Sequence, residues 1–319
     1  MNFGKIAKAF ATSVAVALAS TSAFAADYPS QPIKLIVPFN AGGGSDTFAR
    51  KLQLVIQENN LLSQPIVVVN MDGGGGSVGG SAAANADPDG YTLGLWHFGM
   101  LTTNALGVSQ VSPDDVETVA LMGRWNSILI SRADRGFKDL SDVIKASLDA
   151  PGSVTEATAL GSEVHLQHIM LQDKVPGLDI KLLQSGGGAK RLASILGGHA
   201  DITVFSMAEY VGNPNPDITA LVQFAPTRNP NMPDVPTAIE LGIDQVWNNF
   251  NWIFAPKGTP ADRVQIVQDA VKAAFDTEEF QEFLKSRTLT DEFLTGDAAK
   301  AEIDGPFADI KAAAKLIQK

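Results

Sequence analysis

The stretch IKLIVPFNAGGGSD, residues 33–46, contains the strongest structural pattern in this chain. Its apolar residues from Ile33 to Val37 predict a short buried strand that ends at Pro38. Three glycines follow, and Ser45-Asp46 begins a predicted helix whose apolar residues recur at helical spacing. The first N–H groups of a helix have no partners within it and carry a partial positive charge. This strand–turn–helix unit therefore predicts an anion-binding site.

The same unit occurs again one strand later. Residues Ile66 to Val69 predict a second strand, a run of glycines from Gly73 to Gly76 follows it, and Ser77 begins a helix rich in alanine. A ligand can approach a glycine backbone closely because glycine has no Cβ. The two units together indicate a site that holds an anion, which we interpret as a carboxylate, through backbone donors.

Strand and helix signals alternate along the rest of the chain, which predicts an α/β fold with largely parallel sheets. Residues 275–319 are predicted to form helices on the outside of the first domain, and they show no pattern typical of chemistry. The remaining strands are predicted at residues 91–96, 127–130, 154–159, 180–183, 202–205 and 247–254, with helices at 140–148, 163–172 and 189–196.

The first 25 residues read as a secretory signal peptide. Lys5 and Lys8 form a basic start, residues 9–19 are apolar, and Ala23-Phe24-Ala25 predicts cleavage after Ala25. A membrane anchor is the alternative. It is disfavoured because the segment is rich in Ala, Ser and Thr and shorter than the ~20 residues that a spanning helix needs.

Composition excludes several classes of protein. Removal of the leader changes the net charge of the 319-residue chain from −11 to −13, which argues against nucleic acid and anionic membrane surfaces as partners. Cysteine is absent, so there is no disulfide framework and no thiol chemistry. An exported protein without cysteine fits the Gram-negative periplasm.

Three motifs offer other functions. Gly74, Gly76 and Gly79 match a dinucleotide fingerprint, but the next strand ends in Trp96-His97 and not in the acid that would bind a ribose. Residues 75–79 match the nucleophile elbow of an exported serine hydrolase with Ser77 as nucleophile. That class needs a histidine late in the chain, and the last 120 residues contain none.

The third motif is a histidine pair. His165 and His168 share a helix face and could suggest a metal site, yet no third ligand lies nearby in the sequence. We favour a capping or packing role for the pair. No cofactor and no metal are therefore expected.

Several motifs resemble those of the Bug-type substrate-binding proteins, the periplasmic subunits of tripartite tricarboxylate transporters. The resemblance runs from Tyr28 to the C-terminus in unbroken order. The motifs are PFNAGGGSD, the second glycine loop, PDGYTL, GSEVHL, LGGHAD, PDVPTAIELG and APKGTP.

This resemblance implies two α/β domains joined by two crossing strands that act as a hinge, as in type II-like periplasmic binding proteins. It implies a carboxylate-bearing ligand that is enclosed between them and delivered to integral membrane subunits. We expect the receptor to be a monomer. The expected parts are a signal peptide (1–25), a first domain in two parts (26–129 and 250–319) and a second domain (130–249). A binding protein that serves a sensor has the same sequence features.

The expected ligand-binding residues come from the glycine loops, the end of the third strand and the second domain. Asp46 contacts the ligand or only stabilises its helix N-terminus, and both readings stay open. His97 and Phe98 line the cleft or pack in the hinge, and we favour the cleft. The set is Phe39, Asn40, Ala41, Gly42, Gly43, Gly44, Ser45, Asp46, Gly74, Gly75, Gly76, Ser77, His97, Phe98, Gly161, Ser162, His165, Ser185, Gly186, Asp201 and Phe205.

The chain departs from the family pattern at three places. The second loop commonly reads Asn-Arg-Pro-Gly but here contains Met71-Asp72, so an acid replaces a cation. The third strand ends in Trp96-His97-Phe98 where small polar residues are usual, and Gln184-Ser185 replaces Tyr-Lys. We hypothesise a mono- or dicarboxylate with an apolar or aromatic body as ligand, in place of citrate.

Overall fold

The computed structural model describes residues 28–212 and 214–315. The predicted signal peptide lies outside the described residues. None of the described helices combines the length and apolar content needed to span a bilayer.

The described strands form one curled sheet in the order β2-β1-β3-β9-β4-β7-β5-β6, with β8 and β10 paired to β4. Pairs among β1, β2 and β3 and among β5, β6 and β7 are parallel, whereas the pairs that involve β4 or β9 are antiparallel. The predicted α/β class is therefore confirmed, with a mixed centre between two parallel ends. The strands are β1 (Ile33–Val37), β2 (Ile66–Asn70), β3 (Thr92–Trp96), β4 (Val116–Arg132), β5 (Thr155–Thr158), β6 (Lys181–Gln184), β7 (Ile202–Ser206), β8 (Ile218–Gln223), β9 (Asn248–Pro256) and β10 (Phe293–Leu294).

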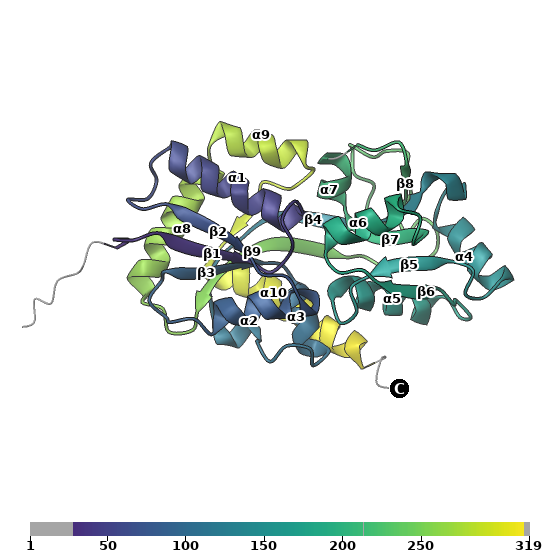
Figure 1. Cartoon of the computed structure of the whole chain (residues 1–319), viewed down its shortest axis with the longest axis horizontal. Coiled ribbons are helices and arrows are strands. Elements are labelled where there is room, and N and C mark those ends of the chain that lie inside the picture. Colours follow the sequence, from purple (N-terminus) through teal and green to yellow (C-terminus); the bar gives the residue numbers. More distant parts are fainter. Residues whose placement is uncertain (1–27, 213, 316–319) are drawn as a thin grey trace, which may run out of the picture.

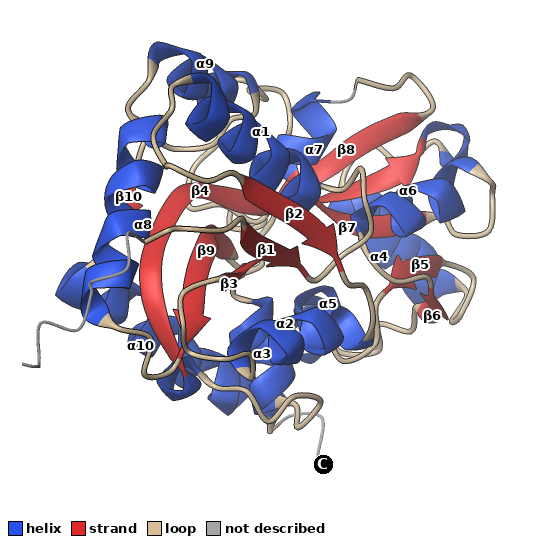
Figure 2. Cartoon of the chain, turned by 60° about the vertical axis from the view of Figure 1, so that its left-hand side comes forward, coloured by secondary structure: helices blue, strands red, loops and turns tan. Residues whose placement is uncertain are grey.

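The first lobe contains β1–β3, β9, β10 and the first half of β4. Its helices cover both faces of the sheet (Figure 2). On one face, α1, α8 and α9 pack a core of apolar side chains that includes Phe48, Val271 and Phe280. Helices α2, α3 and α10 cover the other face. The bounds are α1 (Gly44–Glu58), α2 (Ser77–Ala84), α3 (Gly99–Ala105), α8 (Ala261–Phe275), α9 (Glu278–Ser286) and α10 (Gly296–Ala314).

The second lobe contains β5–β8 and the second half of β4, and it is formed by the middle of the chain, coloured teal and green in Figure 1. Its own core includes Ile130, Phe205 and Met207. A second apolar cluster contains residues of both lobes, among them Leu101 of α3 and Leu166 of α5. The helices are α4 (Leu140–Asp149), α5 (Glu163–Lys174), α6 (Gly188–Leu196) and α7 (Met207–Gly212).

Two long strands, β4 and β9, run between the lobes (Figure 1). β4 pairs with β9 in its first half and with β7 and β8 in its second, and the pairing with β9 reaches Asn126 opposite Asn248. The register of β4 shifts between Met122 and Trp125, around Gly123. These are the two crossing strands that the resemblance implies.

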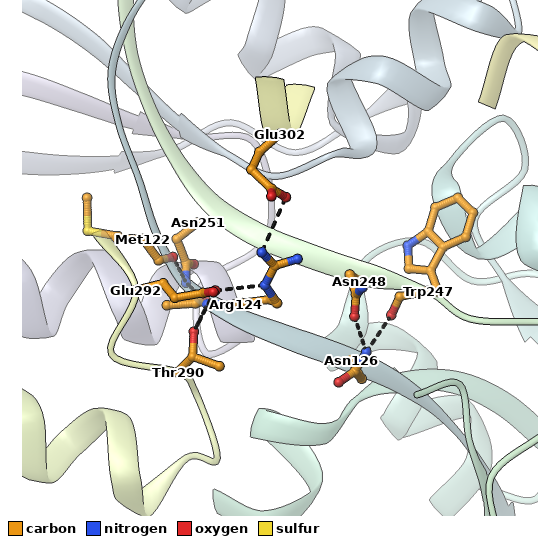
Figure 3. Close-up of polar contacts among 10 residues, drawn as sticks. Met122, Arg124, Asn126, Trp247, Asn248, Asn251, Thr290, Glu292 and Glu302 are labelled. Atoms are coloured by element: carbon orange, nitrogen blue, oxygen red, sulfur yellow. Dashed lines mark hydrogen bonds and ion pairs between the residues drawn. The ribbon is translucent and has the colours of Figure 1, made fainter. Parts of the chain in front are cut away.

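Polar contacts hold the crossing strands where the register shifts (Figure 3). Arg124 donates from Nε to Glu292 at 2.7 Å and from Nη2 to Glu302 at 3.3 Å, and its guanidinium lies 4.3 Å from the centre of the Phe250 ring. Asn126 donates to the carbonyl of Trp247 at 3.2 Å. The C-terminal segment is thereby tied to the hinge.

Candidate functional site

The first glycine loop is built around a buried carboxylate. Asp46 is 3% exposed, and it accepts hydrogen bonds from the Gly42 N–H at 2.9 Å, Arg50 Nε at 3.0 Å and Asn70 Nδ2 at 3.0 Å. Burial opposes its charge, but the bonds from Arg50, Gly42 and Asn70 hold the pKa of Asp46 below its usual range. Asp46 thus fixes the loop from the inside, beneath the N-terminus of α1.

The second glycine loop requires glycine for its backbone shape. Gly73, Gly74, Gly75 and Gly76 all have positive φ, from 56° to 138°, a region that other residues rarely adopt. A Cβ on Gly75 would lie 2.9 Å from the Cβ of Ser162, so this loop touches the N-terminus of α5 in the second lobe. The run of four glycines is therefore a structural requirement at the mouth of the cleft.

A cavity of about 320 Å³ lies between the two lobes, at the carboxyl ends of β1, β2 and β6. Ligands of parallel α/β sheets bind at this end of the strands. The described residues that line it include twelve of the predicted site residues: Phe39, Asn40, Gly43, Gly44, Ser45, Gly74, Gly75, His97, Ser162, Ser185, Gly186 and Phe205.

Three helices begin at this cavity. The first residues of α1, α5 and α6 are Gly44, Glu163 and Gly188, and all three line the cavity. Their N-terminal N–H groups bring partial positive charge to one place, although the chain as a whole is acidic.

Aromatic rings form one wall. Phe39 stacks on His97 with ring centres 5.0 Å apart and planes 5° from parallel, and Trp125 meets His97 edge-on at 5.9 Å. Nδ1 of His97 lies 2.9 Å from the Gly99 N–H and 3.4 Å from Glu163 Oε2. Because a backbone N–H can only donate, Nδ1 of His97 is the acceptor in the shorter contact.

Nine predicted residues lie outside the cavity lining. Asp201 is the clearest correction. It accepts from the Thr155 N–H at 2.9 Å and pairs with Arg135 at 3.2 Å. Thr155 begins β5 and Asp201 precedes β7, so this carboxylate lies at the opposite end of the strands from the cavity.

Four of the nine are held by local packing. Phe98 is buried against Phe250 with ring centres 5.9 Å apart, and its N–H donates to Asn249 Oδ1 at 2.8 Å, so it belongs to the hinge and not to the cleft. Gly76 packs against the Trp96 ring. The Gly161 N–H donates to His165 Nδ1 at 3.2 Å, which closes the turn before α5.

The remaining four belong to the glycine loops. Ala41 and Gly42 are exposed, and Asp46 holds the loop from inside. Gly76 is the N-cap of α2, and not Ser77, whose Oγ lies beneath Gly74. Among the described residues, Ser77 makes no hydrogen bond to a histidine or an acid, and no three groups of the metal-ligating kind are clustered.

The charged lining of the cavity was not predicted from the sequence. Lys190 of α6 reaches across the cleft to Asp72, with Nζ 2.8 Å from Oδ2. Asp72 was noted as a departure from the family pattern, and this ion pair explains how an acid is accommodated there. Glu163, Arg191, Glu209 and Arg287 also line the cavity.

The carboxylate of Glu209, on α7, binds the N-terminus of α1. Its Oε1 accepts the Gly44 N–H at 2.8 Å, and a Cβ on Gly188 would lie 2.7 Å from the same oxygen, so the carboxylate lies beside the first residues of α1 and α6. Burial raises the pKa of Glu209, and the charge of Arg191 and the Gly44 bond oppose the rise. No sequence signal marks Glu209, because α7 itself was not predicted.

Arg191 lies beneath the cavity and is 8% exposed. It donates from Nη1 to the Gly186 carbonyl at 3.0 Å and from Nη2 to that of Val204 at 3.3 Å. Its Nε has no partner among the described residues. Burial lowers the pKa of Arg191, while the charges of Glu209 and Glu163 oppose this. The guanidinium of Arg191 thus places a positive charge near the N-termini of α1 and α6.

Two α/β lobes that enclose a cavity lined by helix N-termini define a solute-binding protein of the periplasmic type. Residues 48–299 match the model of the tripartite tricarboxylate transporter family receptor. The chain belongs to this family, as the resemblance of its motifs led us to expect.

Curated relatives agree over most of their length. The chain is 31% identical over 303 residues to a protein encoded in the TAR-I ttuE-ttuC' intergenic region of Agrobacterium vitis, covering 92% of this chain and 85% of the relative. It is 29% identical over 312 residues to BugT of Bordetella pertussis, and the match covers 95% of this chain and 94% of BugT.

Solved structures share the fold. The periplasmic binding protein BugD superimposes with a TM-score of 0.84 at 25% identity, over 90% of this chain and 98% of that chain. MatC of Rhodopseudomonas palustris with bound malate gives a TM-score of 0.81 at 25% identity, over 90% of this chain and all of the other.

Proposed function

We propose that this protein is a periplasmic receptor that captures a small organic acid in the cavity between its lobes. It then delivers the acid to the integral membrane subunits of a tripartite transporter. The observation that carries the proposal is the convergence of the N-termini of α1, α5 and α6 on one cavity. A carboxylate is the small-molecule group that such backbone donors favour. The malate bound to the relative MatC supports the same ligand class.

The walls of the cavity indicate the body of the ligand. Phe39, His97, Trp125 and Phe205 present rings to it, and these favour an apolar or aromatic body between the polar ends. We infer a mono- or dicarboxylate of this kind.

We propose that binding occurs without turnover, without a cofactor and in a monomer. The rival function, an exported hydrolase, needs an activated Ser77. That side chain lies outside the cavity lining and has no hydrogen bond to a base among the described residues. We also propose that the domains comprise residues 26–129 with 250–319 and residues 130–249, with both boundaries inside the crossing strands. The leader is cleaved after Ala25.

A thermal-shift screen of residues 26–319 tests the proposal. The panel holds citrate, aliphatic diacids, aromatic mono- and diacids and the matched neutral amides. A ligand at about 100 times its Kd adds about 2.7 kcal/mol to the free energy of unfolding, which raises the melting temperature. We expect a rise with acids and none with their amides.

Two outcomes would contradict the proposal. A rise with amides, sugars or cations alone would remove the carboxylate assignment. Release of a product from an ester substrate, abolished in Ser77→Ala, would favour the hydrolase.

A further inference from the structure

One anion position of the cavity is occupied by the protein itself. Glu209 extends from the second lobe to the first, where its Oε1 accepts the Gly44 N–H at 2.8 Å. The same oxygen lies 2.7 Å from where a Cβ on Gly188 would be, so a side chain at the start of α6 would push the carboxylate out of this position. The carboxylate of Glu209 thus occupies the place that the first glycine loop offers to a ligand anion.

The surroundings of Glu209 suit an anion and not a cation. Burial raises the pKa of Glu209, whereas the buried guanidinium of Arg191 and the N-termini of α1 and α6 beside it favour its charged form. An ammonium group brought here would face partial positive charges from both helices. Glu209 therefore stands in for a ligand carboxylate and is not the partner of a ligand amine.

With Glu209 included, the acidic and basic side chains of the cavity lining are equal in number. Among the described residues, the acids are Asp72, Glu163 and Glu209, and the bases are Lys190, Arg191 and Arg287. One ligand carboxylate can use the backbone donors of the second glycine loop and of α5. A second carboxylate would find the N-termini of α1 and α6 already occupied and would lie close to an acid.

We propose that Glu209 is a specificity-determining residue that takes the place of one ligand carboxylate, so that the cavity selects a monocarboxylate over the diacid of the same length. This inference rests on the proposed function and narrows its ligand class.

Isothermal titration calorimetry on residues 26–319 tests it with matched pairs of acids, hexanoate with adipate and benzoate with terephthalate. We compare the unmodified chain with Glu209→Ser, which vacates the position, and Glu209→Gln, which keeps an acceptor for the Gly44 N–H but removes the charge. Asp309→Asn, an exposed change on α10 outside the cavity lining, controls for net charge.

We expect the unmodified chain and Asp309→Asn to prefer the monoacid of a pair. In Glu209→Ser the ratio of diacid to monoacid affinity should rise by at least about tenfold, with a smaller rise in Glu209→Gln. If Glu209→Ser fails to fold, as judged by circular dichroism, Glu209→Gln carries the test, since it preserves the hydrogen bond across the cleft.

The outcomes separate this inference from the function on which it rests. If acids bind but the ratio is unchanged in both variants, or if the unmodified chain prefers the diacid, the role of Glu209 is overturned and the receptor function stands. If no variant binds any carboxylate, the proposed function fails as well.

Discussion

Asp46 carries a negative charge inside the protein because three donors surround it. In Asp46→Asn the charge is lost, and the hydrogen bonds to Arg50 and Gly42 are weakened or broken. We expect the free energy of unfolding at pH 7 to fall by about 2 kcal/mol. Urea denaturation measures the change, and Asp309→Asn, an exposed position, is the control.

The pH dependence of this effect has a definite sign. The pKa of Asp46 is lower in the folded chain than in the unfolded one, so its contribution to stability is present above the usual carboxyl range. That contribution is lost as the pH falls through the lowered pKa. The difference in the free energy of unfolding between the unmodified chain and Asp46→Asn should therefore disappear at acidic pH. A gap that stays constant with pH would show that Asp46 acts by shape and not by charge.

At the scale of single residues, the sequence predicts binding sites made of backbone N–H groups better than it predicts contacts between charged side chains. The glycine loops are visible because a local pattern, strand then glycine then helix, produces them. The ion pair of Asp72 with Lys190 and the bond of Glu209 to Gly44 join positions 118 and 165 residues apart. Which distant side chains meet depends on the whole fold, and no local pattern records it.

Gly123 shows how one element depends on one backbone angle. Its φ of +58° lies in the left-handed region and places the register shift within β4. A Cβ here would also lie 3.3 Å from Leu284 Cδ2 and 3.4 Å from Phe48 Cε2. We expect Gly123→Ala to lower the free energy of unfolding by about 2 kcal/mol, measured by urea denaturation.

Gly107→Ala is the matched control for this change. Gly107 has a φ of +72°, but no atom lies within 4 Å of an added Cβ. Gly107→Ala should therefore lose only the stability that a left-handed backbone costs an alanine. If both variants lose the same stability, the neighbours of Gly123 contribute nothing.

The elements were predicted where their patterns are uninterrupted. The units at β1–α1 and β2–α2 and the helices α5 and α6 are confirmed. For β4, only residues 127–130 were predicted, because Gly123 and Arg124 interrupt the apolar pattern of a strand that spans Val116–Arg132. The short helices α3 and α7 were missed because each is too brief to show helical periodicity.

Across the whole molecule, the pair of Asp72 and Lys190 joins the two lobes over the cleft. We expect Asp72→Asn and Lys190→Gln each to raise the Kd for a bound acid. A double-mutant cycle should give a coupling energy between the two positions of about 0.5 kcal/mol, since the Lys190 side chain is 53% exposed, and the coupling should shrink with added salt.

A second pair provides the control. Arg228 and Glu240 form an exposed ion pair at 2.9 Å within the second lobe, away from the cavity lining. The same cycle on this pair should leave the Kd unchanged. Equal effects of the two cycles would mean that the Asp72–Lys190 pair contributes through net charge and not through its position across the cleft.

The placement of β9 also sets the order in which the chain can fold. β3 pairs with β9 through Gly94 and Phe254, and β9 is the only link between β3 and β4 in the described sheet. Strands β5–β8 are synthesised in between, so the second lobe can assemble while β3 still has an open edge. Closing such a distant contact is slow. A nascent chain that stops before Asn248 therefore presents an unpaired strand edge, to which another chain can add.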